Sequence, residues 1–121
     1  MPNPVRVYVV DDEPVISTTL AAILNFSGFQ ATSFTSAEEA LIAAESEGPS
    51  LVISDVVMPG MDGVSLAIQL KSICPNCKVL LFSGQAATND LLDSASMQGH
   101  KFDLLAKPIH PQELLAAIRK L

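Results

Sequence analysis

The sequence contains no tryptophan, and aromatic residues make up only 5% of it, while apolar residues reach 49%. Its core must therefore be built from aliphatic side chains. Basic residues are scarce as well, with 7 Lys and Arg against 13 Asp and Glu, which gives a formal net charge of −6. A surface with this charge repels phosphate backbones, so the chain by itself is a poor candidate for nucleic-acid binding.

Long apolar runs, a cationic leader and a disulfide framework are also missing. No apolar run approaches the roughly 18 residues of a membrane helix, and the first residues, MPNPVRVYVV, lack the pattern of a signal peptide. We therefore expect no contact with a membrane and a cytoplasmic location. Only two cysteines are present, and a chain of this length can bury a core without disulfides. We predict a single domain over residues 3–121, without linkers or internal repeats.

Apolar runs alternate along the chain with segments of helical periodicity. The runs predict strands at residues 5–10, 30–34, 51–54, 78–82 and 102–105, and the periodic segments predict helices at 14–27, 36–46, 64–73, 88–97 and 111–121. Strict alternation of this kind predicts right-handed crossovers. The expected fold class is therefore α/β, with a five-stranded parallel sheet and five helices on its two faces.

Local signals support the helix boundaries. Pro14 suits the first turn of the first helix, and Gly28 is a plausible stop for it. Ser36 and Glu39 have the spacing of a capping box at the start of the second helix. The first helix is expected to bury an apolar stripe formed by Val15, Ile16, Leu20, Ile23 and Leu24.

Polar side chains follow four of the predicted strands. They are Asp11 and Asp12 after the first strand, Asp55 after the third, Ser83 and Gly84 after the fourth, and Lys107 and Pro108 after the fifth. Ligands of open parallel sheets bind beyond the C-terminal strand ends. Each acid taken alone would more often be a helix cap or a solvated loop residue. Complementary groups at four separate strand ends instead indicate one site.

The acidic residues of this set predict a metal site. Close carboxylates repel one another, and at neutral pH they either share protons or recruit a cation. Because no His or Cys lies near these strand ends, a hard ion such as Mg²⁺ is favoured. We predict that Asp11, Asp12, Asp55 and the backbone carbonyl of Val57 hold it.

The same set predicts phosphoryl chemistry. An aspartate can act as a nucleophile toward phosphorus and form an aspartyl phosphate, and Asp55 is the predicted acceptor. Lys107 would neutralise charge on the transferred group. Ser83 would donate a hydrogen bond to it, and the small Gly84 would leave room for it to enter.

Four stretches resemble, in the same order, the motifs of the receiver domain of two-component response regulators, a family that includes chemotaxis regulators. They are VYVVDDEP, SDVVMPGMDG, LLFSG and LLAKPI, and the resemblance runs essentially from Val5 to Leu121. It implies a flavodoxin-like strand order of 2-1-3-4-5. It also implies Mg²⁺-dependent transfer from a phosphohistidine of a sensor histidine kinase or phosphotransfer protein to Asp55, followed by slow self-dephosphorylation.

By this resemblance the chain is a phosphoacceptor switch and not an enzyme acting on an external substrate. The expected partners are the kinase and an output domain or downstream protein, and homodimerisation is compatible with the family. The chain ends at the last predicted helix with no output domain. It is expected to be either a stand-alone regulator or a receiver from a larger protein, and both alternatives remain open.

The switch region implied by the family would comprise Ser83, Leu104 and Pro108. Here the sequence departs from the family pattern, because Leu104 stands where receivers usually have Tyr or Phe, an aromatic side chain that swings inward on phosphorylation. Phe102 lies two positions earlier and would share a face with Leu104 if the strand is regular. Signalling by rotation of an aromatic ring is therefore not predicted.

Other functions and motifs receive less support. A degenerate receiver that only binds proteins remains an alternative. A phosphatase of the haloacid dehalogenase type would need an Asp-x-Asp nucleophile motif, and a dinucleotide-binding domain would need GxGxxG after the first strand; neither is present. Cys74 and Cys77 form a CxxC that follows a helix, so redox activation is not expected, and His100 and His110 are expected at the surface.

Overall fold

The computed structural model describes residues 5–84, 99, 102–107 and 109–120. Its strands are β1 Arg6–Val10, β2 Gln30–Phe34, β3 Leu51–Asp55, β4 Lys78–Ser83 and β5 Asp103–Ala106. Its helices are α1 Pro14–Phe26, α2 Ala37–Ser46, α3 Gly63–Ile73 and α5 Pro111–Arg119. The predicted helix at 88–97 lies outside the described residues, which therefore contain four of the five predicted helices.

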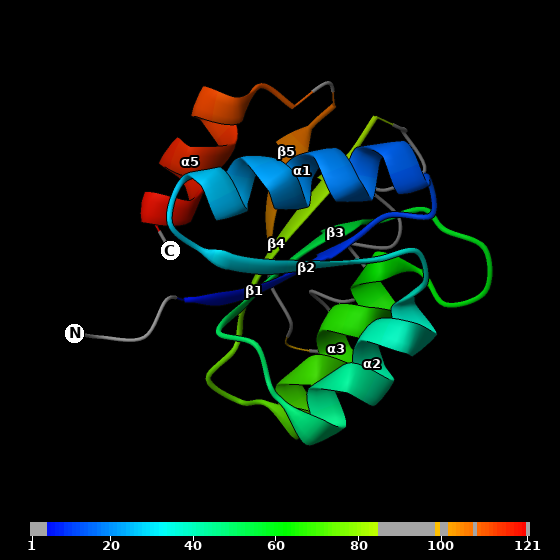
Figure 1. Ribbon diagram of the computed structural model, residues 1–121. Helices are drawn as coiled ribbons and strands as arrows, with labels where there is room; N and C mark the ends of the chain where they lie inside the picture. The colour runs from blue at the N-terminus through cyan, green and yellow to red at the C-terminus, as the bar shows by residue number, and fades with distance from the viewer. Residues whose placement is uncertain (1–4, 85–98, 100–101, 108, 121) are drawn as a thin grey trace.

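The strands form one parallel sheet in the order β2-β1-β3-β4-β5. Helices α1 and α5 cover one face of the sheet, and α2 and α3 cover the other (Figure 1). The predicted flavodoxin-like order is confirmed. Because the strands are parallel and in register, with Val10 beside Ser54 and Ser83 beside Ala106, the residues that follow them meet at one edge.

The central strands are buried on both faces, as their continuous apolar sequences predict. Val9 and Ile53 are fully buried on the side of α1 and α5, where Leu114 of α5 packs in the same cluster. On the side of α2 and α3, Tyr8 and Leu66 belong to a second buried cluster. The sheet is therefore a rigid platform for the groups at its strand ends.

Helix α1 begins at Pro14, as predicted, and Gly28 after its end has a φ of 98°, a backbone conformation that favours glycine. Leu20 and Leu24 are buried, but Val15 is 77% exposed. The expectation that Val15 belongs to the buried stripe is therefore wrong. Its position is on the solvent side of a helix whose buried side faces β1 and β2.

Helices α2 and α3 start within one residue of the predicted positions, each after a side-chain cap, although only the cap at Ser36 was predicted. The Ser36 hydroxyl accepts a hydrogen bond from the Glu39 amide at 3.2 Å, and the Asp62 carboxylate accepts one from the Ser65 amide at 2.8 Å. Each bond satisfies a backbone donor that the first helical turn leaves free. Within the described ranges, no helix is both long enough and apolar enough to cross a membrane.

The two cysteines lie where the sequence places them, between α3 and β4. Cys74 is the residue that ends α3, and its amide bonds to the Leu70 carbonyl at 2.6 Å. Both thiols are free. Burial, with a smaller contribution from Cys74, raises the pKa of Cys77 to about 11. A thiol with so high a pKa is a poor nucleophile, in agreement with a structural role.

Candidate functional site

Three carboxylates gather at the C-terminal edge of the sheet. Asp11 follows β1 and is completely buried, Asp55 is the last residue of β3 and is 7% exposed, and Asp12 is exposed. One carboxylate oxygen from each lies within 4.8 Å of the others. The Glu13 amide donates to Asp11 Oδ1 at 2.9 Å and fixes the orientation of that side chain.

Lys107 bridges two of these acids. Its Nζ lies 3.1 Å from Asp55 Oδ2 and 3.4 Å from Asp11 Oδ2. The ammonium also lies 5.2 Å from the centroid of the buried Phe82 ring, close enough for a cation–π interaction. The Lys107 amide donates to the Ser83 carbonyl at 3.1 Å, so the backbone that carries the lysine is attached to the end of β4.

The other predicted site residues lie around this group. Ser83 ends β4 and is 7% exposed. A Cβ atom added at Gly84 would lie 3.4 Å from Lys107 Cβ, which is an ordinary contact distance. A side chain at this position would therefore fill the space beside Lys107 that glycine leaves open. Val57 is half-buried in the loop after β3, and Leu104 is 41% exposed on β5. Pro108 lies outside the described residues.

Burial controls the electrostatics of the site. It raises the pKa of Asp11 and the pKa of Asp55 above their ordinary values, although hydrogen bonds and the charge of Lys107 act in the opposite direction. Burial alone would lower the pKa of Lys107, but the hydrogen bond and charge of Asp55, together with Asp11, raise it. One ammonium therefore does not fully compensate the acidic cluster.

The donor set fits a hard divalent cation. All three side chains of the cluster offer carboxylate oxygens, and no softer nitrogen or sulfur ligand of the described residues belongs to it. Mg²⁺ prefers one or two carboxylates with waters or phosphate oxygens. A cation at this place would also stabilise the charged forms of Asp11 and Asp55, which burial disfavours.

Two residues that contact the backbone of Asp55 were not predicted from the sequence. A Cβ atom at Gly63 would lie 2.1 Å from the Asp55 carbonyl oxygen, so only glycine fits there without displacing the backbone. The buried Ser54 hydroxyl donates to the same carbonyl at 2.9 Å. The Gly63 amide also bonds to the Val56 carbonyl at 2.8 Å. The small residues at the two ends of SDVVMPGMDG were the available signal.

Comparison with known proteins agrees with this geometry. Residues 7–119 match the protein family described as the response regulator receiver domain. The chain belongs to the response regulator receiver family. It is 32% identical over 119 residues to the probable transcriptional regulatory protein TcrX of Mycobacterium tuberculosis, covering 98% of this chain and 50% of TcrX.

Two further proteins are similar to nearly the whole length of this chain. The chain is 36% identical over 114 residues to the DNA-binding transcriptional regulator NtrC of Salmonella typhimurium, covering 94% of this chain and 24% of NtrC. The crystal structure of a CheY-like receiver domain protein from Methanospirillum hungatei has a TM-score of 0.86 and 26% identity, covering 97% of this chain and 92% of that one. This receiver thus spans half or less of the curated relatives named here.

Membership of this family establishes the general role of the chain. It is a receiver domain of two-component signalling, a phosphoacceptor module with an acidic pocket at the C-terminal edge of its sheet.

Proposed function

We propose that Asp55 is the phosphoacceptor of this receiver. The observation that carries the proposal is the position of its carboxylate at the end of a central strand, 3.1 Å from the ammonium of Lys107, which also bonds to the buried Asp11. Asp55 retains 7% exposure, so a donor can approach it. Asp11 is completely buried and is bonded to the Glu13 amide, which makes it a poorer nucleophile.

The reaction is a displacement at phosphorus. The bond between phosphorus and an imidazole nitrogen of the donor phosphohistidine breaks, and its electron pair stays on that nitrogen. A bond forms between phosphorus and a carboxylate oxygen of Asp55, giving the aspartyl phosphate. Lys107, already 3.1 Å from the acceptor carboxylate, would neutralise charge on the transferred oxygens.

Asp11, Asp12, Asp55 and the carbonyl of Val57 would hold Mg²⁺ in this proposal. When bound, Mg²⁺ would supply positive charge that lets an anionic nucleophile meet an anionic phosphoryl group. Asp12, the exposed member of the cluster, would contribute from the solvent side. The buried Asp11 would contribute from within, with its orientation set by the Glu13 amide.

The response to phosphorylation would begin at Ser83. Its hydroxyl would donate to the phosphoryl group, and Gly84 would leave space for the added oxygens. Ser83 pairs with Ala106 in the sheet, so a change at Ser83 reaches β5, where Leu104 is exposed. Leu104 and Pro108 would complete the switch region, without rotation of an aromatic ring at position 104.

The partners follow from the reaction and from the relatives. A sensor histidine kinase or phosphotransfer protein would supply the phosphoryl group. TcrX and NtrC are transcriptional regulators by name, and we propose that this receiver likewise controls an output domain or a separate protein. In this role it is a switch and not an enzyme acting on an external substrate.

Intact-mass measurement after incubation with acetyl phosphate and Mg²⁺ tests the proposal. One added phosphoryl group is expected, and it should disappear in Asp55→Asn and in a sample treated with EDTA. Asp103→Asn, which changes an exposed acid of β5, is the matched control and should be labelled normally. Labelling of Asp55→Asn at the wild-type level would show that the acceptor is another residue.

A further inference from the structure

Cys74 and Cys77 lie at the opposite edge of the sheet from the acidic cluster, in the turn between α3 and β4. The Cys77 amide donates to the Cys74 carbonyl at 2.9 Å. A bond of this kind closes a β-turn, and a proline such as Pro75 is favoured at the second position of the turn. The Lys71 ammonium also donates to the Cys77 carbonyl, so α3 fixes the end of the turn.

The turn holds the two cysteines within reach of each other. The Cα atoms at the two ends of a β-turn are less than about 7 Å apart, and disulfides join Cα atoms that are about 4.4–6.8 Å apart. Cys77 belongs to the same buried cluster as Tyr8 and Leu66, and Cys74 packs against this cluster. Both side chains therefore point to the side of the sheet that α2 and α3 cover. A bond between their sulfur atoms needs rotation of the side chains and no new backbone structure.

The two thiols differ in how easily a reagent can reach them. Cys77 is 2% exposed, and its thiol donates weakly to the Lys78 carbonyl at 3.4 Å. Cys74 is half-buried, and its sulfur lies beside the exposed Gly48, where an added Cβ atom would be only 2.7 Å from it. Because Gly48 has no side chain, the approach to the Cys74 sulfur is open. A small reagent therefore reaches Cys74 before it reaches Cys77.

The apolar surroundings of the pair favour a neutral product. Burial raises the pKa of Cys77 to about 11, so a thiolate is disfavoured there. A soft metal ion bound by both sulfur atoms would keep them as thiolates inside the cluster. A disulfide carries no charge and is compatible with an apolar surrounding.

We propose that Cys74 and Cys77 form a reversible dithiol–disulfide site that exchanges with small disulfides. The turn follows a helix and does not open one, so the thiolate activation of redox catalysts is not expected. The site is accordingly a slow acceptor of oxidising equivalents and not an oxidoreductase. It does not depend on phosphorylation of Asp55, so it stands independently of the function proposed above.

The exchange has two steps. The Cys74 thiolate attacks one sulfur of a small disulfide, the sulfur–sulfur bond of that molecule breaks, and one of its halves leaves as a thiolate with the electron pair. Cys77 then loses its proton to the solvent and attacks the Cys74 sulfur, which releases the other half. The two cysteines are oxidised by two electrons in total. The small disulfide is reduced to two thiols, which take up the two protons.

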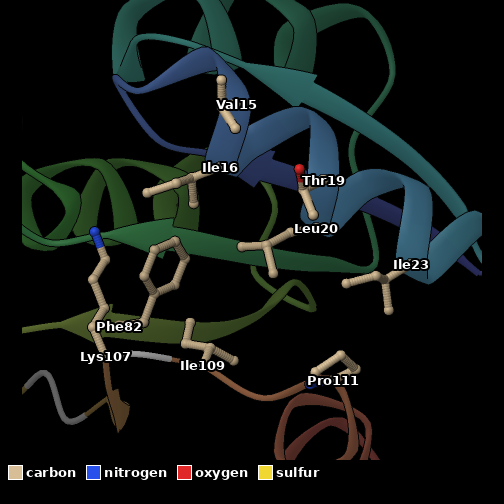
Figure 2. A pocket seen from close by; sticks show the side chains of 9 residues that line it. All are labelled: Val15, Ile16, Thr19, Leu20, Ile23, Phe82, Lys107, Ile109 and Pro111. Atoms are coloured by element: carbon tan, nitrogen blue, oxygen red, sulfur yellow. The ribbon is translucent and has the colours of Figure 1, made fainter.

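Oxidation of the pair should leave the phosphoacceptor site unchanged. Lys107 of that site borders an apolar groove of about 630 Å³ between α1 and α5. Figure 2 shows Lys107 and Phe82 at this groove, which lies on the face of the sheet away from α2 and α3. A disulfide between Cys74 and Cys77 would touch neither the groove nor the acidic cluster. Normal labelling by acetyl phosphate is therefore the check that an oxidised chain is still folded.

Incubation of the whole folded chain with mixtures of oxidised and reduced glutathione tests the proposal. After an acid quench the chain is unfolded, its remaining thiols are alkylated, and intact mass shows how many were left. A chain with an internal disulfide carries neither an alkyl group nor glutathione. This species is expected to dominate in oxidised glutathione and to disappear when dithiothreitol is added.

Two single variants separate the two steps. Cys77→Ser keeps the accessible thiol and is expected to stop at one bound glutathione on Cys74. Cys74→Ser keeps only the buried thiol and is expected to stay reduced as long as the chain is folded. Circular dichroism checks that both variants are folded.

The same titration in urea measures what the fold contributes. Because the turn is already formed, the folded chain should favour the internal disulfide over the unfolded chain by roughly tenfold or more. The coupling is reciprocal, so the disulfide should stabilise the folded state by the same factor. The urea midpoint of the oxidised chain should therefore lie above that of the reduced chain.

Three results would overturn the proposal. A wild-type chain that stays reduced, or that stops at bound glutathione, would show that the two sulfur atoms do not come into contact. Reaction of folded Cys74→Ser with glutathione as readily as Cys77→Ser would contradict the order of attack. A disulfide that forms no more readily in the folded chain than in urea would show that the turn does not position the pair.

Discussion

Lys107 Nζ lies 3.1 Å from Asp55 Oδ2, although 52 positions separate the two residues in the chain. The same ammonium lies 3.4 Å from Asp11 Oδ2. The parallel sheet brings the ends of β1, β3 and β5 to one edge. There Lys107, after β5, forms ion pairs with Asp11, after β1, and with Asp55, at the end of β3. The proposed chemistry depends on this arrangement.

Removing the Lys107 ammonium should slow phosphorylation of the chain strongly and change its fold little. Lys107→Ala eliminates the group that would neutralise charge on the phosphoryl oxygens, and we expect a fall of about a hundredfold in the rate of labelling by acetyl phosphate. The rate is measured by intact mass against time. Lys78→Ala, at an exposed lysine of β4, is the control. Equal rates for the two variants would mean that Lys107 has no part in the transfer.

Mg²⁺ should stabilise the folded chain. Binding to the folded state alone would add about 2.7 kcal/mol to the free energy of unfolding at a Mg²⁺ concentration a hundred times Kd. Asp55→Asn removes one negative charge from the buried cluster and should reduce this gain. In EDTA the same variant should be more stable than wild type, because less uncompensated charge is buried. Thermal unfolding with and without Mg²⁺ measures both effects, and an identical Mg²⁺ response in wild type and variant would remove Asp55 from the metal site.

Gly63→Ala should disturb the acceptor through the backbone. The added Cβ would lie 2.1 Å from the Asp55 carbonyl oxygen, and neither backbone segment can give way cheaply. We expect a loss of about 2–4 kcal/mol in the free energy of unfolding, together with slower labelling. Gly48→Ala is the matched control, since its Cβ would meet the Cys74 side chain at 2.7 Å. A side chain can rotate away, so the urea midpoint should fall much less in this control.

The two cysteines should differ in reactivity. Cys77 is 2% exposed and burial raises its pKa to about 11, so it is almost entirely a thiol at mildly alkaline pH. Alkylation by iodoacetamide should therefore modify the half-buried Cys74 first and reach Cys77 only as the chain unfolds or the pH approaches that pKa. Peptide mapping of the alkylated chain distinguishes the two sites. Equal modification of both in the folded chain would contradict the buried position of Cys77.

Most of the sheet could be predicted because the central strands are continuous apolar runs. The strand order came from the resemblance to a family, whereas the shared edge came from the parallel arrangement alone. The edge strand β2 has the predicted bounds, Gln30–Phe34, whereas the other edge strand is displaced by one residue. The fifth strand was expected at 102–105 and lies at Asp103–Ala106, because its limits are set by pairing with β4 and not by its own hydrophobicity.

The acidic cluster could be predicted because its residues carry chemistry at recognisable strand ends. Gly63 and Ser54 were missed, because they act through shape and one hydrogen bond to the backbone of Asp55 and carry no chemistry of their own. Val15 shows a further limit. Its apolar side chain suited the apolar stripe of α1, but its helical position directs it to the solvent.

Mapping the phosphorylated residue tests the central claim most directly. The chain is labelled with acetyl phosphate and Mg²⁺, reduced with borohydride so that an aspartyl phosphate becomes homoserine, digested, and sequenced by mass spectrometry. Homoserine at position 55, dependent on the phosphodonor, is the predicted result. Homoserine at position 11 or 12, or a labelled chain with unmodified Asp55, would contradict it.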